Sequence, residues 1–484
     1  MLSIPSRRLA ALAAGVAVLA APSLASAQAI NDDPALVWLR TLPGATVRQS
    51  SPLLLDLNGD GRLDVTFGAY DSRVYSLSGV DGSTLWSRQT TEPINSSPSA
   101  ADVTKDGKPE LFVGVGIANN RGGALYSLDR GGNVRFRTPL PDNDFKAGAP
   151  VHSSPAMGDV NGDGAIDANV GALAVKSLWS VRGTDGVPNF RRPLFYWDDT
   201  IFSSPALADV TGDRIPEVIV GGDSTPGLPI DHRGGMVRAV TGTGRSVWEF
   251  RINDIVVSSP AVGDIDGDGR LEVVFGAGDY YHGSDATSVF AVDAATGRLK
   301  WRRATDGVTA GSPALADING DGRLDVAIAT FNSNPMRPGD RPLPVKGGSV
   351  YALDGRNGAD LTGFPQASRG GMVLGGIVTA DLDGDGGQDL LVPTGAMISA
   401  FSGKTGLLLF KLTEGQRVAF QNSPAVGDVD DNGRLDIVAV GTKVDGTGVA
   451  YRWELPGRAK LGSLAWPQFH KDARRTGAWP VGAR

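Results

Sequence analysis

Apolar and polar positions alternate in short runs along this chain, and the same succession of runs returns many times. A short strand ending in Ser-Pro comes first, as in "SSPAVGD" at 258–264, and an acidic loop follows it. A run of β-branched and apolar residues comes next, such as "LEVVFGA" at 271–277, and then an alternating strand such as "SVFAVDA" from 288. A Gly-containing turn leads to a fourth strand with a bulky aromatic residue, as in "LKWRRA" from 299. Strand-length runs, alternation and Gly/Asn/Asp punctuation predict an all-β protein.

The acidic loop occurs in eight near-copies of nine residues, of which "DLNGDGRLD" at 56–64 is the first. The copies begin 46, 57, 50, 55, 53, 64 and 47 residues apart, a period that suits a four-stranded propeller blade. The eighth repeat has no obvious fourth strand, whereas "ALVWLRT" at 35–41 has the form of one. Docking that segment onto the last blade would close the ring and remove two sheet edges. We therefore predict a single eight-bladed β-propeller, closed by an N-terminal strand, with an acidic loop between strands one and two of each blade.

The two ends of the chain suggest export. Arg7 and Arg8 precede the apolar run "LAALAAGVAVLAA", which ends at the small residues 25–27, so we predict a signal peptide over 1–27. The propeller is expected over 28–457 and a C-terminal tail over 458–484. No later stretch is long and apolar enough to span a membrane, and no cysteine is present to form a disulfide. We expect a secreted protein of the periplasm or the extracellular medium.

Positions 1, 3, 5 and 9 of each loop carry oxygen-bearing side chains, and position 6 is Gly in seven of the eight copies. Oxygen ligands on alternate residues around a sharp turn favour Ca²⁺, which takes about 6–8 of them. The loop is not an EF-hand, because position 12 is apolar and lies in a predicted strand, so position 9 must supply the closing carboxylate. The alternative is a set of Asp/Gly turns without metal, in which the uncompensated carboxylates would repel one another. The predicted calcium ligands are Asp56, Asn58, Asp60, Asp64, Asp102, Thr104, Asp106, Glu110, Asp159, Asn161, Asp163, Asp167, Asp209, Thr211, Asp213, Glu217, Asp264, Asp266, Asp268, Glu272, Asp317, Asn319, Asp321, Asp325, Asp381, Asp383, Asp385, Asp389, Asp428, Asp430, Asn432 and Asp436.

These loops, with "FGA" or "VGG" closing the next strand, resemble the FG-GAP (VCBS-type) repeats of bacterial secreted proteins and integrin α-chain propellers. The resemblance implies up to eight bound Ca²⁺ ions, one between strands one and two of each blade. Blade 4 departs from the pattern, because Thr211 replaces an acid or amide and Arg214 replaces the Gly, so its site is doubtful. Segments such as "VDAATGRLKW" at 292–301 also resemble blades of quinoprotein propellers. Their quinone typically lies beside a vicinal disulfide, which a chain without cysteine cannot form, so we interpret this likeness as shared blade architecture.

The long insertions of the chain are predicted on the face opposite the acidic loops, because they join strands two and three or consecutive blades. Long loops on a rigid scaffold commonly hold binding residues. His152 also belongs to this region, although a lone His or Tyr in a loop is most often simply solvated or covering strand ends. No His-Glu-x-x-His, nucleophile-elbow or nucleotide-loop motif occurs, so no catalytic residue is predicted. The candidate ligand-binding residues are Tyr196, Trp197, Asp198, His232, Arg233, Tyr280, Tyr281, His282 and Arg337.

Three functions remain open. The first is a non-catalytic binding or adhesion module, stabilised by calcium, that binds a glycan or a cell-surface protein at the long-loop face. The second is an enzyme similar to the polysaccharide lyases that share such a propeller, acting on an acidic glycan. The third is a scaffold subunit of an envelope complex. We expect no nucleic-acid partner, and leave open whether the protein is an enzyme.

Charge adds one expectation. The formal net charge is −7, and it becomes −9 without the signal peptide, which contains Arg7 and Arg8 but no acid. Eight Ca²⁺ ions would bring the protein to about +7, or to about +5 with blade 4 empty. A cationic, calcium-loaded protein could associate with an acidic polysaccharide, aided by arginines of the predicted fourth strands. These arginines are Arg88, Arg135, Arg137, Arg191, Arg192, Arg251, Arg302 and Arg303.

Overall fold

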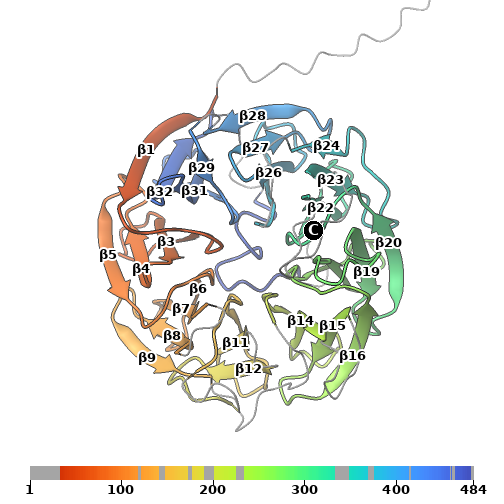
Figure 1. Ribbon diagram of the computed structural model, residues 1–484, viewed down its shortest axis with the longest axis horizontal. Helices are drawn as coiled ribbons and strands as arrows, with labels where there is room; N and C mark the ends of the chain where they lie inside the picture. Colours follow the sequence, from red (N-terminus) through yellow and green to blue (C-terminus); the bar gives the residue numbers. More distant parts are fainter. Residues whose placement is uncertain are drawn as a thin grey trace, which may run out of the picture.

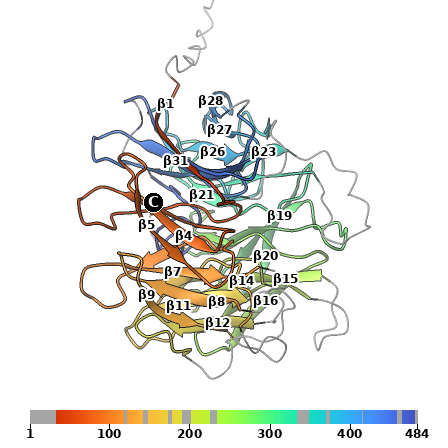
Figure 2. The ribbon, with the colours of Figure 1, turned by 60° about the vertical axis from the view of Figure 1, so that its left-hand side comes forward.

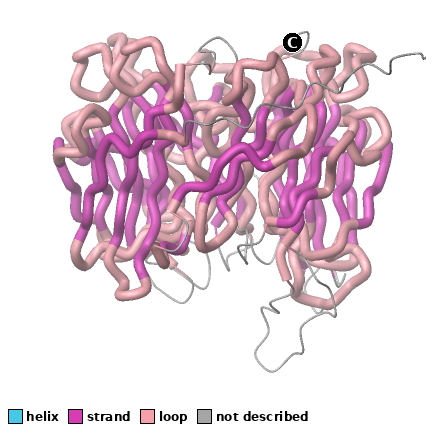
Figure 3. Tube along the Cα trace, turned by 90° about the horizontal axis from the view of Figure 1, so that it is seen from above, coloured by secondary structure: helices cyan, strands magenta, loops and turns pink. Residues whose placement is uncertain are grey.

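The computed structural model describes residues 33–480 except 118–121, 141–147, 173–176, 190–200, 225–233, 333–347, 369–374, 414–415, 458 and 460–463. Eight antiparallel sheets surround a central axis (Figure 1), and their strands run between the two faces of the ring (Figure 3). Every regular element in the described part of the chain is a strand. The predicted eight-bladed, all-β propeller is confirmed.

The strands nearest the axis contain three residues each. They are β2 (Leu53–Leu55), β6 (Ser99–Ala101), β10 (Ala156–Gly158), β13 (Ala206–Ala208), β17 (Ala261–Gly263), β21 (Ala314–Ala316), β25 (Val378–Ala380) and β30 (Ala425–Gly427). Each begins after the Ser-Pro step where one is present, so the prediction of a strand ending in Ser-Pro was wrong. Proline has no N–H to donate to a β-ladder, so the strand begins after it. The hydroxyl of the preceding serine bonds to a neighbouring blade, as described below.

The second strands begin at loop position 9. They are β3 (Asp64–Ala69), β7 (Glu110–Val115), β11 (Asp167–Ala172), β14 (Glu217–Ser224), β18 (Glu272–Gly276), β22 (Asp325–Ala329), β26 (Asp389–Pro393) and β31 (Asp436–Lys443). The third strands are β4 (Arg73–Leu77), β8 (Ala124–Leu128), β12 (Ser177–Arg182), β15 (Gly234–Val240), β19 (Ser288–Asp293), β23 (Ser349–Leu353), β27 (Ile398–Phe401) and β32 (Gly448–Glu454). Neighbouring blades cover both faces of these strands, which is why their sequences are nearly continuous apolar runs.

The outermost strands form the rim of the ring (Figures 1 and 2). They are β5 (Thr84–Gln89), β9 (Val134–Thr138), β16 (Ser246–Ile252), β20 (Leu299–Ala304), β24 (Gln366–Ala367), β28 (Leu408–Leu412) and β1 (Ala35–Leu42). No fourth strand is described for blade 3, and a short strand, β29 (Val418–Ala419), pairs with β31 in blade 8. The rim strands alternate exposed and buried residues, because only their inner face meets the core.

The N-terminal strand closes the ring as predicted. β1 pairs antiparallel with β32 from Ala35↔Glu454 to Leu42↔Gly448. Trp38 Nε1 then donates a hydrogen bond of 2.7 Å to the carbonyl of Gly79 in blade 1. Rim tryptophans of blades 1, 4 and 5 make the same contact with the following blade, through Trp86 to Arg130, Trp248 to Ala294 and Trp301 to Gly355. The closing strand therefore supplies both the missing ladder of blade 8 and its clasp onto blade 1.

The C-terminal tail lies inside the ring, where Figure 1 shows it crossing the centre. It makes at least one hydrogen bond to the middle residue of every inner strand, in the order of the blades around the axis. These bonds join Thr379 N to Trp466 O (2.9 Å), Val426 N to Pro467 O (2.8 Å), Leu54 N to Gln468 Oε1 (3.4 Å), Ala100 N to Ala473 O (2.8 Å), Met157 N to Arg474 O (2.9 Å), Leu207 N to Thr476 O (2.9 Å), Val262 N to Gly477 O (2.8 Å) and Trp479 Nε1 to Leu315 O (3.1 Å). The tail thus completes one circuit of the channel.

Two polar side chains fix the tail at the axis. Arg475 is fully buried and donates to the carbonyl oxygens of Pro52, Pro98 and Phe469. His470 is 2 % exposed, and its ring nitrogens lie 2.9 Å from the carbonyl oxygens of Arg475 and Pro260. The tail residues consequently satisfy backbone carbonyls of the inner ring that would otherwise be buried without a donor.

Candidate functional site

Each acidic loop folds around the carboxylate at position 1. In blade 1, Asp56 accepts the N–H of Gly59 at 2.7 Å with Oδ1 and that of Gly61 at 3.0 Å with Oδ2. Gly61 has φ +84°, a left-handed conformation that favours glycine. Loop position 6 repeats this conformation in the other blades, which explains why the sequence keeps Gly there.

The carboxylate at position 9 is buried, because that residue opens the second strand of its blade. In blade 1 its Oδ2 accepts the N–H groups of Leu57 at 3.0 Å and Asn58 at 3.2 Å. Burial raises the pKa of most of these groups, and the neighbouring loop carboxylates add to the effect. The pKa rises to about 6 at Asp64, Asp167 and Asp436, to about 7 at Glu272 and Asp325, and well above its ordinary value at Asp389.

Blades 3 and 6 contain buried carboxylate oxygens without a hydrogen-bond partner. Asp167 is 0 % exposed and Asp325 is 2 % exposed, and the unpartnered atoms are both oxygens of Asp167 and Oδ2 of Asp325. A buried, unpaired carboxylate is strongly unfavourable unless a cation or a donor satisfies it. The donor set of these loops fits a hard cation such as Ca²⁺, with the position 9 carboxylate as one ligand.

A basic side chain approaches the acidic loop in blades 5, 7 and 8, and in blade 1 the guanidinium of Arg130 lies 3.6 Å from Asp56. Three carboxylate groups converge within 4.8 Å in each of blades 5, 7 and 8, at Asp264/Asp266/Glu272, Asp381/Asp383/Asp385 and Asp428/Asp430/Asp436. Lys300 Nζ lies 2.9 Å from Glu272 and also contacts Asp266 in blade 5. The buried guanidinium of Arg452 lies 2.6 Å from Asp430 and 2.9 Å from Asp436 in blade 8, and Lys404 Nζ lies 3.6 Å from Asp385 in blade 7.

A side-chain cation and a metal ion would therefore compete for the same carboxylates in blades 5 and 8. From the sequence, these loops have the same predicted calcium ligands as the others. The competition could not be predicted, because Lys300 belongs to β20 and Arg452 to β32, far along the chain from the loops they reach.

Blade 4 keeps the loop geometry without the glycine. Asp209 accepts the N–H groups of Gly212 at 2.7 Å and Arg214 at 2.8 Å, as in the other loops. Arg214 has φ +71°, which is unfavourable for a residue with a Cβ. Thr211 Oγ1 donates to Glu217 at 3.2 Å, so a hydroxyl partly satisfies the buried carboxylate of this blade.

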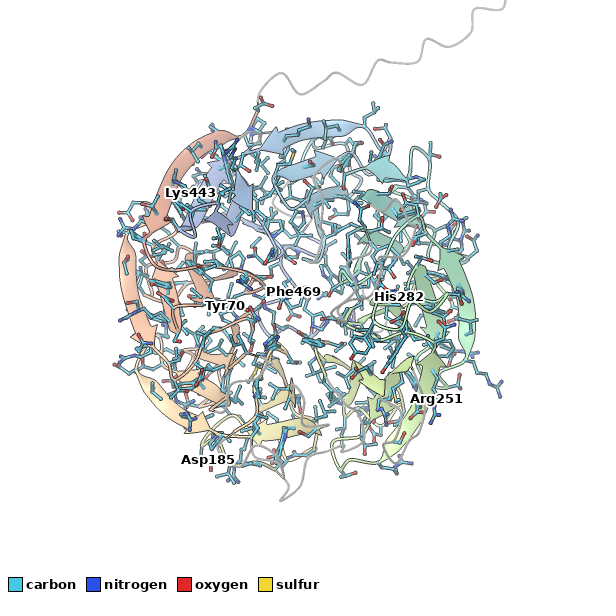
Figure 4. The ribbon with its side chains drawn as sticks, viewed as in Figure 1. Tyr70, Asp185, Arg251, His282, Lys443 and Phe469 are labelled. Atoms are coloured by element: carbon cyan, nitrogen blue, oxygen red, sulfur yellow. The ribbon has the colours of Figure 1, made fainter. Side chains whose placement is uncertain are left out.

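Of the predicted ligand-binding residues, the structure describes Tyr280, Tyr281 and His282. Their loop folds around Asp254, which is fully buried and accepts the N–H groups of Tyr280, Tyr281 and Gly283. The rings of the two tyrosines meet edge to face at 4.8 Å. His282 Nδ1 lies 2.7 Å from Asp279 Oδ1 (His282 is labelled in Figure 4). The other predicted residues lie outside the described residues: Tyr196, Trp197, Asp198, His232, Arg233 and Arg337.

A ring of serine hydroxyls surrounds the channel on the face opposite the acidic loops. In six blades the serine before the Ser-Pro proline accepts a backbone N–H from its counterpart in the preceding blade, whereas Ser423 in blade 8 donates its N–H and its Oγ has no partner. The bonds run from Ser51 N to Ser97 Oγ, Ser97 N to Ser154 Oγ, Ser154 N to Ser204 Oγ, Ser204 N to Ser259 Oγ, Ser259 N to Ser312 Oγ and Ser423 N to Ser51 Oγ, at 2.9–3.1 Å. This ring holds the inner ends of the blades at a fixed spacing, and Gly376 takes the equivalent position in blade 7.

The serine ring encloses a cavity of about 290 Å³ at the mouth of the channel. Phe469 of the tail, near the axis in Figure 4, contributes its floor. The residue that precedes each Ser-Ser pair or its equivalent lines the wall, and the lining includes Gln49, Asn95, His152, Phe202, Val257, Ala310 and Gln421. We call this space the channel-mouth cavity.

Two buried asparagines give the channel-mouth cavity unused hydrogen-bonding capacity. Asn95 is 5 % exposed and donates to Tyr70 Oη at 3.0 Å, whereas Asn422 is 2 % exposed and donates to the carbonyl of Arg48 at 2.7 Å. The Oδ1 atom of each has no hydrogen-bond partner. Buried amide oxygens are nearly always satisfied, and these two are covered by protein atoms, so a donor in the cavity reaches them only after a small side-chain movement.

The sequence analysis missed this cavity, although it noticed His152 and the Ser-Pro step. The sequence contains one signal of this cavity. The residue just before the repeated Ser-Ser-Pro, or its equivalent, differs from blade to blade and is Gln, Asn, His, Phe, Val or Ala. A variable position next to a repeated one is expected where a rigid scaffold presents different side chains to one central space.

The fold and these sites define an eight-bladed β-propeller with acidic loops between strands one and two. Its repeats are FG-GAP-like: the model of the FG-GAP-like repeat family matches residues 56–113. A second model, PQQ_2, described as outer membrane protein assembly factor BamB, matches residues 233–406. No curated protein matches the sequence.

Solved structures share the fold. The Vibrio cholerae biofilm matrix protein Bap1 aligns with a TM-score of 0.60 and 16 % identity over 93 % of this chain and 97 % of its own. BamB from Moraxella catarrhalis aligns with a TM-score of 0.54 and 14 % identity over 87 % of this chain and 100 % of its own. The computationally designed protein Ika8 gives 0.53 and 14 % over the same shares. No described segment is a helix long and apolar enough to cross a membrane.

Proposed function

We propose that this protein is a non-catalytic binding module that works outside the cytoplasm and takes its ligand at the channel-mouth cavity. The observation that carries the proposal is the pair of buried, unpartnered amide oxygens of Asn95 and Asn422 in that cavity. A preformed concave site with a few convergent polar groups is the usual form of a ligand site. The predicted signal peptide and the fold likeness to a biofilm matrix protein agree with a role outside the cell.

The titratable groups of the channel-mouth cavity favour binding over proton transfer. Burial lowers the pKa of His152 to about 4, so its ring is neutral at physiological pH. Asp279 is 3 % exposed and already contacts His282. A general acid or base works best with a pKa near the working pH and access to its substrate, whereas the pKa of His152 lies well below that range and Asp279 is buried.

We further propose that Ca²⁺ binds the acidic loops and stabilises the blades, rather than taking part in ligand binding. The loops lie on the face opposite the channel-mouth cavity, and their buried carboxylates need a counter-charge. Extracellular calcium sites commonly bind at about 10⁻⁴–10⁻³ M, which keeps them filled outside the cell. Ions that bind only the folded state stabilise it by mass action, which matters in a protein without disulfides.

A binding screen of the mature protein tests the proposed function. The protein, with and without calcium, is applied to a glycan array and to immobilised cell-surface extract, beside the variants Asn95→Ala and Asn422→Ala. Asn133→Ala serves as the matched control, because Asn133 lies in an exposed turn between β8 and β9. We expect the wild type and the control to bind and the cavity variants to lose binding.

Other outcomes would assign one of the remaining functions. Ultraviolet absorbance from unsaturated sugar ends would identify a lyase. A stable complex that the two cavity substitutions leave intact would identify a scaffold that uses another surface. Either result would contradict binding at the channel-mouth cavity.

A further inference from the structure

The wall of the channel-mouth cavity has a polar side and an apolar side. Blades 8, 1, 2 and 3 contribute amide and imidazole groups, from Gln421, Asn422, Gln49, Asn95 and His152. Blades 4, 5 and 6 contribute apolar groups, from Phe202, Val257, Ala310 and Phe331. The two sides face each other across one axis. A ligand that satisfies both must carry hydrogen-bonding groups along one side and carbon-bound hydrogens along the other.

The polar side requires donors from the ligand. Asn95 and Asn422 each donate an amide N–H within the protein, and their Oδ1 atoms, which have no partner, can only accept. Hydroxyl or amide N–H groups of a ligand would satisfy both atoms. The gain in affinity is largest at such sites, because an analogue without the donor leaves a buried acceptor unpaired.

The charge of the lining argues against an anionic ligand. None of the described residues that line the cavity is Lys or Arg. The half-buried imidazole of His152 is neutral because its pKa is lowered to about 4, and the one carboxylate among the described lining residues, Asp279, is buried beside His282. A carboxylate or sulfate group of a ligand would lose its hydration without gaining a cationic partner, which is unfavourable.

The depth of the cavity limits how a ligand can enter. The tail bonds to all eight inner strands directly beneath the serine ring, and its Phe469 forms part of the floor. The volume of about 290 Å³ lies at the lower end of the range for small-molecule sites, roughly 300–1,000 Å³. A chain could therefore place an end in the cavity, but could not pass through it.

We propose that the channel-mouth cavity binds the terminal residue of a neutral glycan, with ring hydroxyls donating to Asn95 and Asn422 and the carbon-bound face of the sugar against Phe202. A sugar ring combines these two faces in a unit of suitable size. This proposal rests on the proposed binding function and adds the ligand class. The neutral ligand of the cavity is distinct from any acidic polymer, which we expect to bind the arginines of the rim strands.

The test begins with a glycan array that presents neutral and uronic-acid-containing oligosaccharides. A neutral hit is then titrated calorimetrically as a free linear oligosaccharide, and again with a bulky aromatic cap on one end or the other. We expect neutral glycans to bind, the corresponding uronic-acid ends to bind at least tenfold more weakly, and one of the two caps to abolish binding.

Three variants assign the contacts. Asn95→Ala and Asn422→Ala should each weaken binding at least tenfold by removing the acceptor, and Phe202→Leu should do so by removing the aromatic face. Asn133→Ala should bind as the wild type does. Melting curves of all four show whether they are folded, and the Phe202 variant keeps the test valid if an asparagine variant does not fold.

Several results would overturn the proposal. Uronic-acid ends that bind as tightly as neutral ends would refute the neutral class, and binding that survives both caps would refute terminal recognition. Absence of any glycan ligand would refute the ligand class altogether. In that case, capture of a protein partner that depends on Asn95 and Asn422 would leave the proposed binding function standing, whereas its absence would remove both.

Discussion

Replacing Asp325 with asparagine should change the stability of this protein in opposite directions with and without calcium. Asp325 opens β22 at position 9 of the sixth acidic loop, where it is 2 % exposed and its Oδ2 has no partner. Burial raises its pKa from 3.8 to about 7, with further contributions from Asp321, Asp354 and Asp317. Without metal, the folded protein therefore binds this proton more tightly than the unfolded chain does, and its stability falls as the pH rises from about 4 to about 7.

The size of the effect follows from the shift. Three pKa units correspond to about 4 kcal/mol at 1.36 kcal/mol per unit, an upper value for one group among coupled neighbours. Asparagine has nearly the same shape and no charge, so Asp325→Asn should recover up to about 4 kcal/mol in chelator at pH 8 and only about 1 kcal/mol at pH 4.5. For a chain of 484 residues, 1 kcal/mol moves Tm by about 1 °C. In calcium the same substitution removes a ligand and should lower Tm.

The assay is differential scanning calorimetry at pH 4.5 and pH 8, in chelator and in millimolar calcium. Asp431→Asn is the matched control, because Asp431 is exposed at position 4 of the eighth loop and is not a predicted ligand. The control should leave Tm unchanged in all four conditions. If Asp325→Asn lowers Tm equally with and without calcium, the carboxylate is satisfied within the protein and the calcium assignment for blade 6 is wrong.

Four further predictions concern the scaffold. Trp466→Ala, in the fully buried start of the tail, should reduce the free energy of unfolding by about 3–5 kcal/mol in a denaturant titration, and an unchanged midpoint would show that the tail does not support the ring. Deleting residues 34–42 removes β1 and the Trp38 clasp, so size-exclusion chromatography should show aggregation; a soluble, equally stable product would contradict closure by this strand. Arg214→Gly should stabilise the protein by about 1 kcal/mol by relieving φ +71°, and a loss of stability would mean that the arginine side chain makes a contact of greater value. Adding calcium to chelated protein should move its electrophoretic mobility toward the cationic side, and mobility that stays anionic would refute high occupancy of the loops.

The repeat made the fold predictable from the sequence. Eight acidic loops at a blade-length period fixed the number of blades, and the aromatic segment at 35–41 supplied the strand missing from the last one. The burial of position 9 could also be anticipated, because that residue opens a strand whose sequence is a nearly continuous apolar run. A sequence pattern that recurs in every blade indicates local structure, because every blade must form that structure in the same way.

The candidate site was less predictable, because it depends on contacts between repeats. Lys300 and Arg452 reach acidic loops from other strands of their own blades, and no spacing in the sequence indicates this. The channel-mouth cavity collects one residue from each of several blades, so its members lie about 50 residues apart in the chain. The aromatic loop at 280–282 was identified from the sequence. Its conformation depends on Asp254, which accepts its backbone N–H groups, and nothing in the sequence distinguishes Asp254 from other acidic residues.

The pairing of β1 with β32 has a consequence for export. If the predicted signal peptide directs export of the unfolded chain from its N-terminus onward, the first strand of this ring can pair only after residues 448–454 have followed it. The inner circuit of the tail needs still later residues, up to Trp479. In that case neither closure can form before residues 448–479 have crossed, and the ring stays open until then. A protein truncated before residue 448 would lack both the β1–β32 pairing and the inner circuit of the tail. Its sheet edges would then be exposed to proteases.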